Sequence, residues 1–126
     1  MLVPLPVQQQ IVQQAPLVAY VPARLAPGWK YVHWTATEET LVISFTKAGK
    51  QIDFFVRRFR GDCTAGRGKT FQLAGVKVYW NHTPSEQMAW RCVGGVRMMA
   101  VTSLPPNRFA DVGLGRMAAS GHRIPR

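Results

Sequence analysis

The densest group of chemically capable side chains in this sequence is basic and lies between residues 57 and 69. Five cations fall in that segment with one aromatic residue, Phe59, among them, and Lys77 follows further along. Arg and Lys side chains attract polyanions, and nucleic-acid binding also needs exposed aromatic rings for stacking. The candidate polyanion-binding residues are Arg57, Arg58, Arg60, Arg67, Lys69 and Lys77. A charged loop without a ligand is the alternative.

The whole chain carries the same excess of positive charge. Sixteen Lys and Arg stand against six Asp and Glu, which gives a net charge of +10 and an isoelectric point near 10.7. Such a balance favours nucleic acid, anionic lipid headgroups or acidic cell-wall polymers as partners. A basic surface that only keeps the protein in solution is equally compatible with these totals.

Patterns of catalysis and metal binding are absent from the sequence. His33, His82 and His122 lie on a predicted strand, a turn and the tail, without a neighbouring ligand at metal spacing. The six acids form no evident carboxylate pair, and no Ser or Cys nucleophile has a base nearby in motif form. We therefore predict no catalytic residue, no metal ligand and no cofactor.

The two cysteines, Cys63 and Cys92, allow one disulfide. It would close a loop of about thirty residues and contribute on the order of 3 kcal/mol in an oxidising compartment. Two unpaired thiols, with Cys92 as a small buried side chain, are the alternative.

The stretch Thr70–Thr102 predicts three antiparallel strands, the last two joined at Gly94-Gly95. Both glycines accept the positive φ that a two-residue hairpin turn requires. With that turn, Trp90 faces Met99 and Met88 faces Val101. One face of this hairpin then has the composition of a core and collects Met88, Trp90, Cys92, Met99 and Val101.

A second hairpin is predicted from Thr40–Thr46 and Gln51–Arg58, with its turn at Ala48-Gly49. Closing that turn pairs apolar residues throughout one face, namely Phe45 with Ile52, Ile43 with Phe54, and Leu41 with Val56. We expect this face to align with the face that carries Trp90. Trp29–Thr35 adds a further strand, so that the sheet has five to six.

Helices are predicted at both ends of the chain. Residues 1–15 are rich in Gln and carry Val7, Ile11, Val12 and Ala15 at helical spacing, which indicates a short helix or a mobile arm. After Pro105-Pro106-Asn107 a closing helix is expected to stop at Gly121 and, because it contains glycine, to need close packing on the sheet. The fold class is α+β: a curved antiparallel sheet packed by a C-terminal helix, with residues 16–126 as one domain.

Membrane and targeting signals are weak. No apolar run approaches the roughly 20 residues that span a bilayer. The opening residues MLVPLPVQQQ lack the basic start and long apolar core of a signal peptide. We expect either a cytoplasmic protein or one from which a targeting segment was removed.

Two blocks of the sequence have a distinctive pattern: the first is Tyr20–Trp29, YVPARLAPGW, and the second is Gly75–Trp80 followed by Ala89-Trp90-Arg91. Together they resemble a bacterial domain of unknown function that occurs in exported lipoproteins and in extracytoplasmic parts of sigma-factor regulators. The resemblance covers roughly residues 17–120 and implies an exported, non-enzymatic binding module with a lipoprotein-carrier-like shape. It also favours the Cys63–Cys92 disulfide, and it supplies no site residues.

These observations leave three hypotheses. The first is an exported binding or assembly module at the bacterial cell envelope, with a protein or an envelope polyanion as partner. The second is a cytoplasmic nucleic-acid-binding protein, for example one of phage or mobile-element origin. The third is a structural subunit that forms homo-oligomers through residues 1–28.

Overall fold

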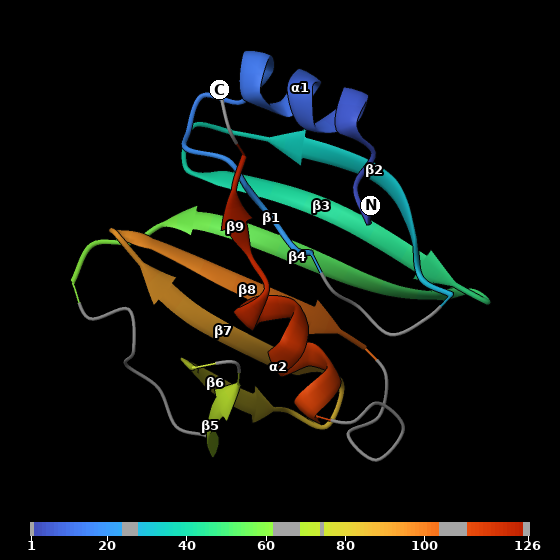
Figure 1. Cartoon of the computed structure of the whole chain (residues 1–126). Coiled ribbons are helices and arrows are strands. Elements are labelled where there is room, and N and C mark those ends of the chain that lie inside the picture. The colour runs from blue at the N-terminus through green and yellow to red at the C-terminus, as the bar shows by residue number, and fades with distance from the viewer. Residues whose placement is uncertain (1, 24–27, 62–68, 74, 104–110, 125–126) are drawn as a thin grey trace.

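A computed structural model of the chain describes residues 2–23, 28–61, 69–73, 75–103 and 111–124 (Figure 1). Their secondary structure consists of two helices and nine strands. In chain order these are α1 (Leu5–Gln14), β1 (Tyr20–Val21), β2 (Lys30–Ala36), β3 (Thr40–Lys47), β4 (Lys50–Arg58), β5 (Lys69–Leu73), β6 (Val76–His82), β7 (Gln87–Val93), β8 (Val96–Thr102), α2 (Asp111–Ala119) and β9 (His122–Arg123).

The main sheet has seven strands in the order β2-β3-β4-β8-β7-β6-β5, and all its pairs are antiparallel. The prediction of five to six strands was therefore too low. The stretch Thr70–Thr102 contributes to four strands rather than three, because the chain turns at Gly75, whose φ is 77°, and pairs Leu73 with Val76. The antiparallel sheet and the closing helix are confirmed.

Both predicted hairpins form with the expected register. Trp90 pairs with Met99 and Met88 with Val101 across β7 and β8, and Gly94 and Gly95 have φ values of 48° and 80°. Phe45 pairs with Ile52 and Ile43 with Phe54 across β3 and β4. Alternating side chains and the conformational freedom of glycine were enough to fix these pairings.

The two apolar faces were expected to lie on the same side of the sheet, and this prediction was wrong: the β4–β8 pairing differs from the expected one by one residue. Strand β8 pairs with β4 so that Ala100 stands opposite Phe54 and Met98 opposite Val56. We call the side that carries these residues the covered face. It also carries Leu41, Ile43, Phe45, Ile52 and Ala89, all 0% exposed. Trp90 lies on the opposite side and does not belong to the hydrophobic core cluster.

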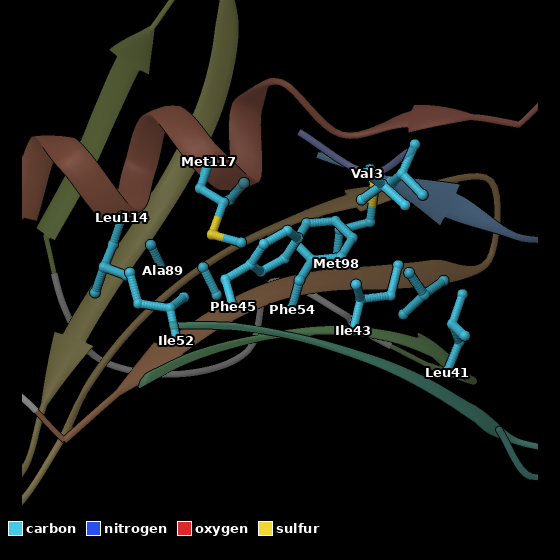
Figure 2. Packing of buried hydrophobic residues seen from close by; sticks show 14 of the residues in the cluster. Val3, Leu41, Ile43, Phe45, Ile52, Phe54, Ala89, Met98, Leu114 and Met117 are labelled. Carbon is cyan, nitrogen blue, oxygen red and sulfur yellow. The ribbon is translucent and has the colours of Figure 1, made fainter. Parts of the chain in front are cut away.

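Small side chains on β7 and β8 explain this arrangement. Ala89 and Ala100 leave room for Leu114 and Met117 of α2, which point down toward Phe54, Met98 and their neighbours (Figure 2). The opposite face of these two strands carries larger side chains, namely Met88, Trp90, Met99 and Val101, which would hold a helix further from the sheet. The helix therefore packs on the strand face with the smaller residues.

Other elements cover the same side of the sheet. Figure 1 shows the two-stranded ribbon β1–β9 beside α2, with α1 at the β2 end. Val21 and Ile124 of the ribbon segment and Val3 and Ile11 of the N-terminal segment are at most 4% exposed and belong to the core cluster. The expected short N-terminal helix is thus docked on its own chain. Within the described residues, no helix has the length and hydrophobicity needed to cross a bilayer.

Helix α2 packs on the sheet, as predicted, and Gly121, two residues after its last residue, lies close to two core side chains. A Cβ atom on Gly121 would lie 2.6 Å from Met98 Sδ and 3.2 Å from Phe54 Cζ, and both of these side chains are fully buried. We expect Gly121→Ala to lower the free energy of unfolding by about 1–3 kcal/mol through overpacking. Urea denaturation measures this effect.

Gly115→Ala is the matched control. Its Cβ atom would lie 2.8 Å from Leu73 Cδ1, which is the end of a partly buried side chain that can rotate. Alanine also favours a helix over glycine by about 1 kcal/mol, so we expect a smaller net change than for Gly121→Ala. Equal destabilisation by both substitutions would contradict the tight contact assigned to Gly121.

Candidate functional site on the outer sheet face

The side of the main sheet opposite the covered face carries a mixture of aromatic, apolar and charged side chains. We call it the outer face, and register and strand alternation assign to it Val42, Ser44, Asp53, Phe55, Arg57, Tyr79, Trp90, Arg97, Met99 and Val101. Most of these side chains are partly exposed, and no described helix or strand packs over them. This face can therefore meet a partner without unfolding of the core.

Two arginines lie side by side on the outer face, near the end of β4 and the start of β8. Arg57 of β4 stands directly opposite Arg97 of β8 in the strand pairing. Together with Thr40, Phe55 and Met99 they line a hollow of about 230 Å³. Like charges directly opposite one another destabilise a sheet, so this pairing is costly in the isolated chain.

Aromatic rings hold Arg97 in place. Its Cζ atom lies 4.8 Å from the centroid of the Trp90 ring and 5.2 Å from that of Phe59. Its Nε atom is buried without a hydrogen-bond partner. Burial, and secondly the charge of Arg57, lower the pKa of Arg97 from its ordinary value. The guanidinium is thus partly desolvated and fixed by cation–π contacts before any ligand arrives.

The aromatic support continues along the face. Tyr79 of β6 stacks on Trp90 of β7 with ring centroids 5.6 Å apart. The Nζ atom of Lys77 lies 5.7 Å from the centroid of the Tyr79 ring. A row of cation, ring, ring and cation therefore runs across three strands from Lys77 to Arg97.

The structure divides the predicted polyanion-binding residues between the two sides of the sheet. Arg57 and Lys77 lie on the outer face, Lys77 beside Tyr79. Arg58 donates a hydrogen bond to the Pro16 carbonyl at 3.1 Å, and the Nζ atom of Lys69 lies over the Trp80 ring at 5.4 Å. Arg60 is exposed beyond the end of β4, and Arg67 lies outside the described residues. The predicted cluster is therefore not a single surface.

Sequence reasoning missed Arg97, the best-supported cation of the face. Forty residues separate it from Arg57, and only the β4–β8 pairing brings the two together. The register set by the Gly94-Gly95 turn places Arg97 opposite Cys92 on β7. No local signal predicted which strand would neighbour β8 on its other side.

Arg91, one position from Trp90, has a structural role. Its Nη1 atom donates a hydrogen bond of 2.7 Å to the carbonyl of Ala119, the last residue of α2. Burial lowers the pKa of Arg91, and the interaction with Tyr20 opposes that shift. A cation at a helix C-terminus satisfies a free carbonyl and complements the helix dipole, so Arg91 ties α2 to the sheet.

Neither metal chemistry nor the cysteines define another site. No group of three or more His, Cys, Asp and Glu side chains could hold a metal ion in the described part of the chain. Cys92 is half-buried on β7, and Cys63 lies outside the described residues, so the Cys63–Cys92 disulfide stays a prediction.

A second hollow, of about 390 Å³, lies on the covered side beside the N-terminal segment. Leu2, Val3, Leu5 and Gln8 line it from one side, and Pro22, Ala23 and His122 line it from the other. Leu5 is 51% exposed there. This hollow contains no charged side chain of the predicted set.

The protein belongs to the structural class of antiparallel sheets that have helices on one face and leave the other face uncovered by the described helices and strands. No protein-family model matches the sequence, and no curated protein matches it. Among solved structures, the fold is similar to that of MucB in the crystal structure of MucB in complex with MucA(peri). The TM-score is 0.56 and the identity 14%, over 87% of this chain and 38% of the MucB chain. The likeness bears out, at the level of the fold, the resemblance drawn from the sequence.

Proposed function

We propose that this protein is a non-enzymatic binding module of the bacterial cell envelope and that it acts by holding another protein. The observation that carries this proposal is the fold shared with MucB, whose crystal structure contains MucA(peri) as a bound partner. The chain spans 38% of that MucB chain, so the comparison concerns the domain and not the whole of MucB.

The outer face supports a binding role. It combines a small hollow, two arginines and partly exposed apolar side chains, as expected for an interface with a polar rim. The site contains no nucleophile with a base beside it and no paired carboxylates, which would be the elements of catalysis.

An extracytoplasmic location belongs to the same proposal. The Cys63–Cys92 disulfide would form and persist in an oxidising compartment, where it adds stability to a small domain. Fractionation of the tagged protein from its natural host tests the location. Titration of its thiols under denaturing, non-reducing conditions tests the bond.

We expect the protein in the envelope fraction, without free thiols before reduction and crosslinked by lysine-reactive reagents to one partner protein at saturable yield. The Cys63→Ser variant is the control for the titration, since it must show one free thiol. Two free thiols in a cytoplasmic protein would contradict the proposal.

Nucleic-acid binding has less support. A track for a phosphate backbone needs cations along one surface and exposed rings for stacking. Here the predicted cations are split between the two sides of the sheet, and Trp90 is 2% exposed. A gel-shift series with salt from 50 mM upward tests this alternative directly.

Self-assembly through the N-terminal arm also has less support. Of the apolar residues at helical spacing in that arm, Ile11 is 0% exposed, and Val7, Val12 and Ala15 are partly buried against the core of the same chain.

A further inference from the structure

We propose that Arg57 and Arg97 receive the carboxylates of an acidic segment of the partner protein, with an apolar side chain of that segment packed against Phe55 and Met99. This inference deepens the proposed function, on which it rests, by naming the chemistry of the partner. It follows from the charge, the packing and the size of the hollow between β3, β4 and β8.

Arg57 and Arg97 stand directly opposite each other in the strand pairing. Within the described part of the chain, neither Arg57 nor Arg97 forms an ion pair. Asp53, a carboxylate on the same face, already accepts hydrogen bonds from Ser44 Oγ at 2.7 Å and Gln51 Nε2 at 2.8 Å. It also lies four positions from Arg57 along β4, with Phe55 between them on that face. The repulsion across the strands is therefore left for an external anion to relieve.

The arginines also have the form that carboxylate recognition requires. A guanidinium is a planar fork of donors that binds a carboxylate through two parallel hydrogen bonds. The rings of Trp90 and Phe59 fix Arg97, so a ligand loses little affinity to ordering that side chain. Burial has already removed part of its hydration, which strengthens a charged hydrogen bond formed there.

The size and lining of the hollow favour a peptide over a nucleic acid. A volume of about 230 Å³ holds one or two side chains, and Phe55 and Met99 supply apolar walls beside the cations. The deeper aromatic residue, Trp90, is occupied by Arg97 and Tyr79 and cannot stack on a base. Acidic residues next to an apolar one would satisfy both parts of the site.

Fluorescence anisotropy on the full chain tests the inference with a labelled synthetic decapeptide that alternates Glu or Asp with Leu. The same peptide with Gln and Asn in place of the acids is the ligand control. At 150 mM salt we expect the acidic peptide to bind at least tenfold more tightly than the neutral one.

Substitutions at the site locate the binding. Arg57→Gln and Arg97→Gln should each weaken the acidic peptide about tenfold or more, and Arg97→Lys should weaken it less than Arg97→Gln because it keeps the charge without the fork. Arg123→Gln is the matched control. It removes the same charge from an exposed residue of β9 on the other side of the sheet, and affinity should stay within about twofold. Since Arg57 is exposed, its variant keeps the test valid even if Arg97→Gln fails to fold.

Three results would overturn the inference: equal binding of the acidic and neutral peptides, an equal loss with Arg123→Gln, or tighter binding of a single-stranded oligonucleotide that displaces the peptide. Capture of the same envelope partner by wild type, Arg57→Gln and Arg97→Gln alike would overturn this inference and leave the proposed function standing. A cytoplasmic location would overturn the proposed function whatever the peptide measurements show.

Discussion

Phe54→Ala will lower the free energy of unfolding by about 3–5 kcal/mol, whereas Phe55→Ala will lower it by about 1 kcal/mol or less. The two residues are neighbours on β4 but point to opposite sides of the sheet. Phe54 is 0% exposed and lies beneath α2 with Met98 and Met117, and Phe55 is partly exposed on the outer face. Removing the first ring leaves a cavity in the core, and removing the second leaves space that water can fill.

Urea denaturation followed by tryptophan fluorescence measures both variants, and circular dichroism at zero denaturant checks that each still folds. Each variant is the control for the other, because both remove a phenylalanine ring from neighbouring positions of the same strand. A similar loss for both phenylalanines would contradict the assignment of the covered face and the outer face.

Ile11→Ala is expected to lower the free energy of unfolding by about 2–5 kcal/mol. Ile11 is 0% exposed although it lies on a helix of ten residues at the edge of the fold. The Gln10 side chain of the same helix accepts a hydrogen bond from Trp34 Nε1 at 3.1 Å, which fixes α1 against β2. A helix this short is marginal alone, so its burial is what holds it in place.

Leu5→Ala, on the same helix, should change stability by about 0.5 kcal/mol or less because Leu5 is 51% exposed. Light scattering of the folded proteins should give the same mass for wild type and both variants. A drop in mass with Ile11→Ala, without loss of stability, would show that α1 serves assembly and would contradict its role in the core.

The local parts of this fold could be predicted from the sequence. Alternation in Thr40–Thr46 and Gln51–Arg58, with glycine at the turn, fixed a register that the structure repeats. The turn at Gly75 was missed although the apolar positions change phase across it, from Phe71 and Leu73 to Val76 and Val78. Hairpins depend on neighbours in the chain, and such contacts are visible in a sequence.

The buried face of the β7–β8 hairpin could not be inferred from its composition. Trp90 and Met99 are large and apolar, and size suggested that they form the core. The core instead uses Ala89 and Ala100, because α2 occupies the volume above them. Which face of the hairpin is buried depends on α2, which follows the hairpin in the chain. The residue pattern of the hairpin itself does not contain that information.

For the same reason, only one of the two arginines of the candidate site could be predicted from the sequence. Arg57 stands in a conspicuous basic run, and Arg97 stands between Val96 and Met98 in an apolar strand. Their meeting depends on the pairing of β4 with β8, which joins two separate hairpins. Non-local pairing of this kind sets the chemistry of the outer face.

The ribbon pairs β1, which follows α1, with β9, the last strand of the described residues. Tyr20 pairs with Arg123, and the Ile124 amide donates to the Ala19 carbonyl at 2.9 Å. The two strands of the ribbon are about 100 positions apart in the chain, so its closure costs more loop entropy than that of either local hairpin. We therefore expect the hairpins to form first and the ribbon to close after them.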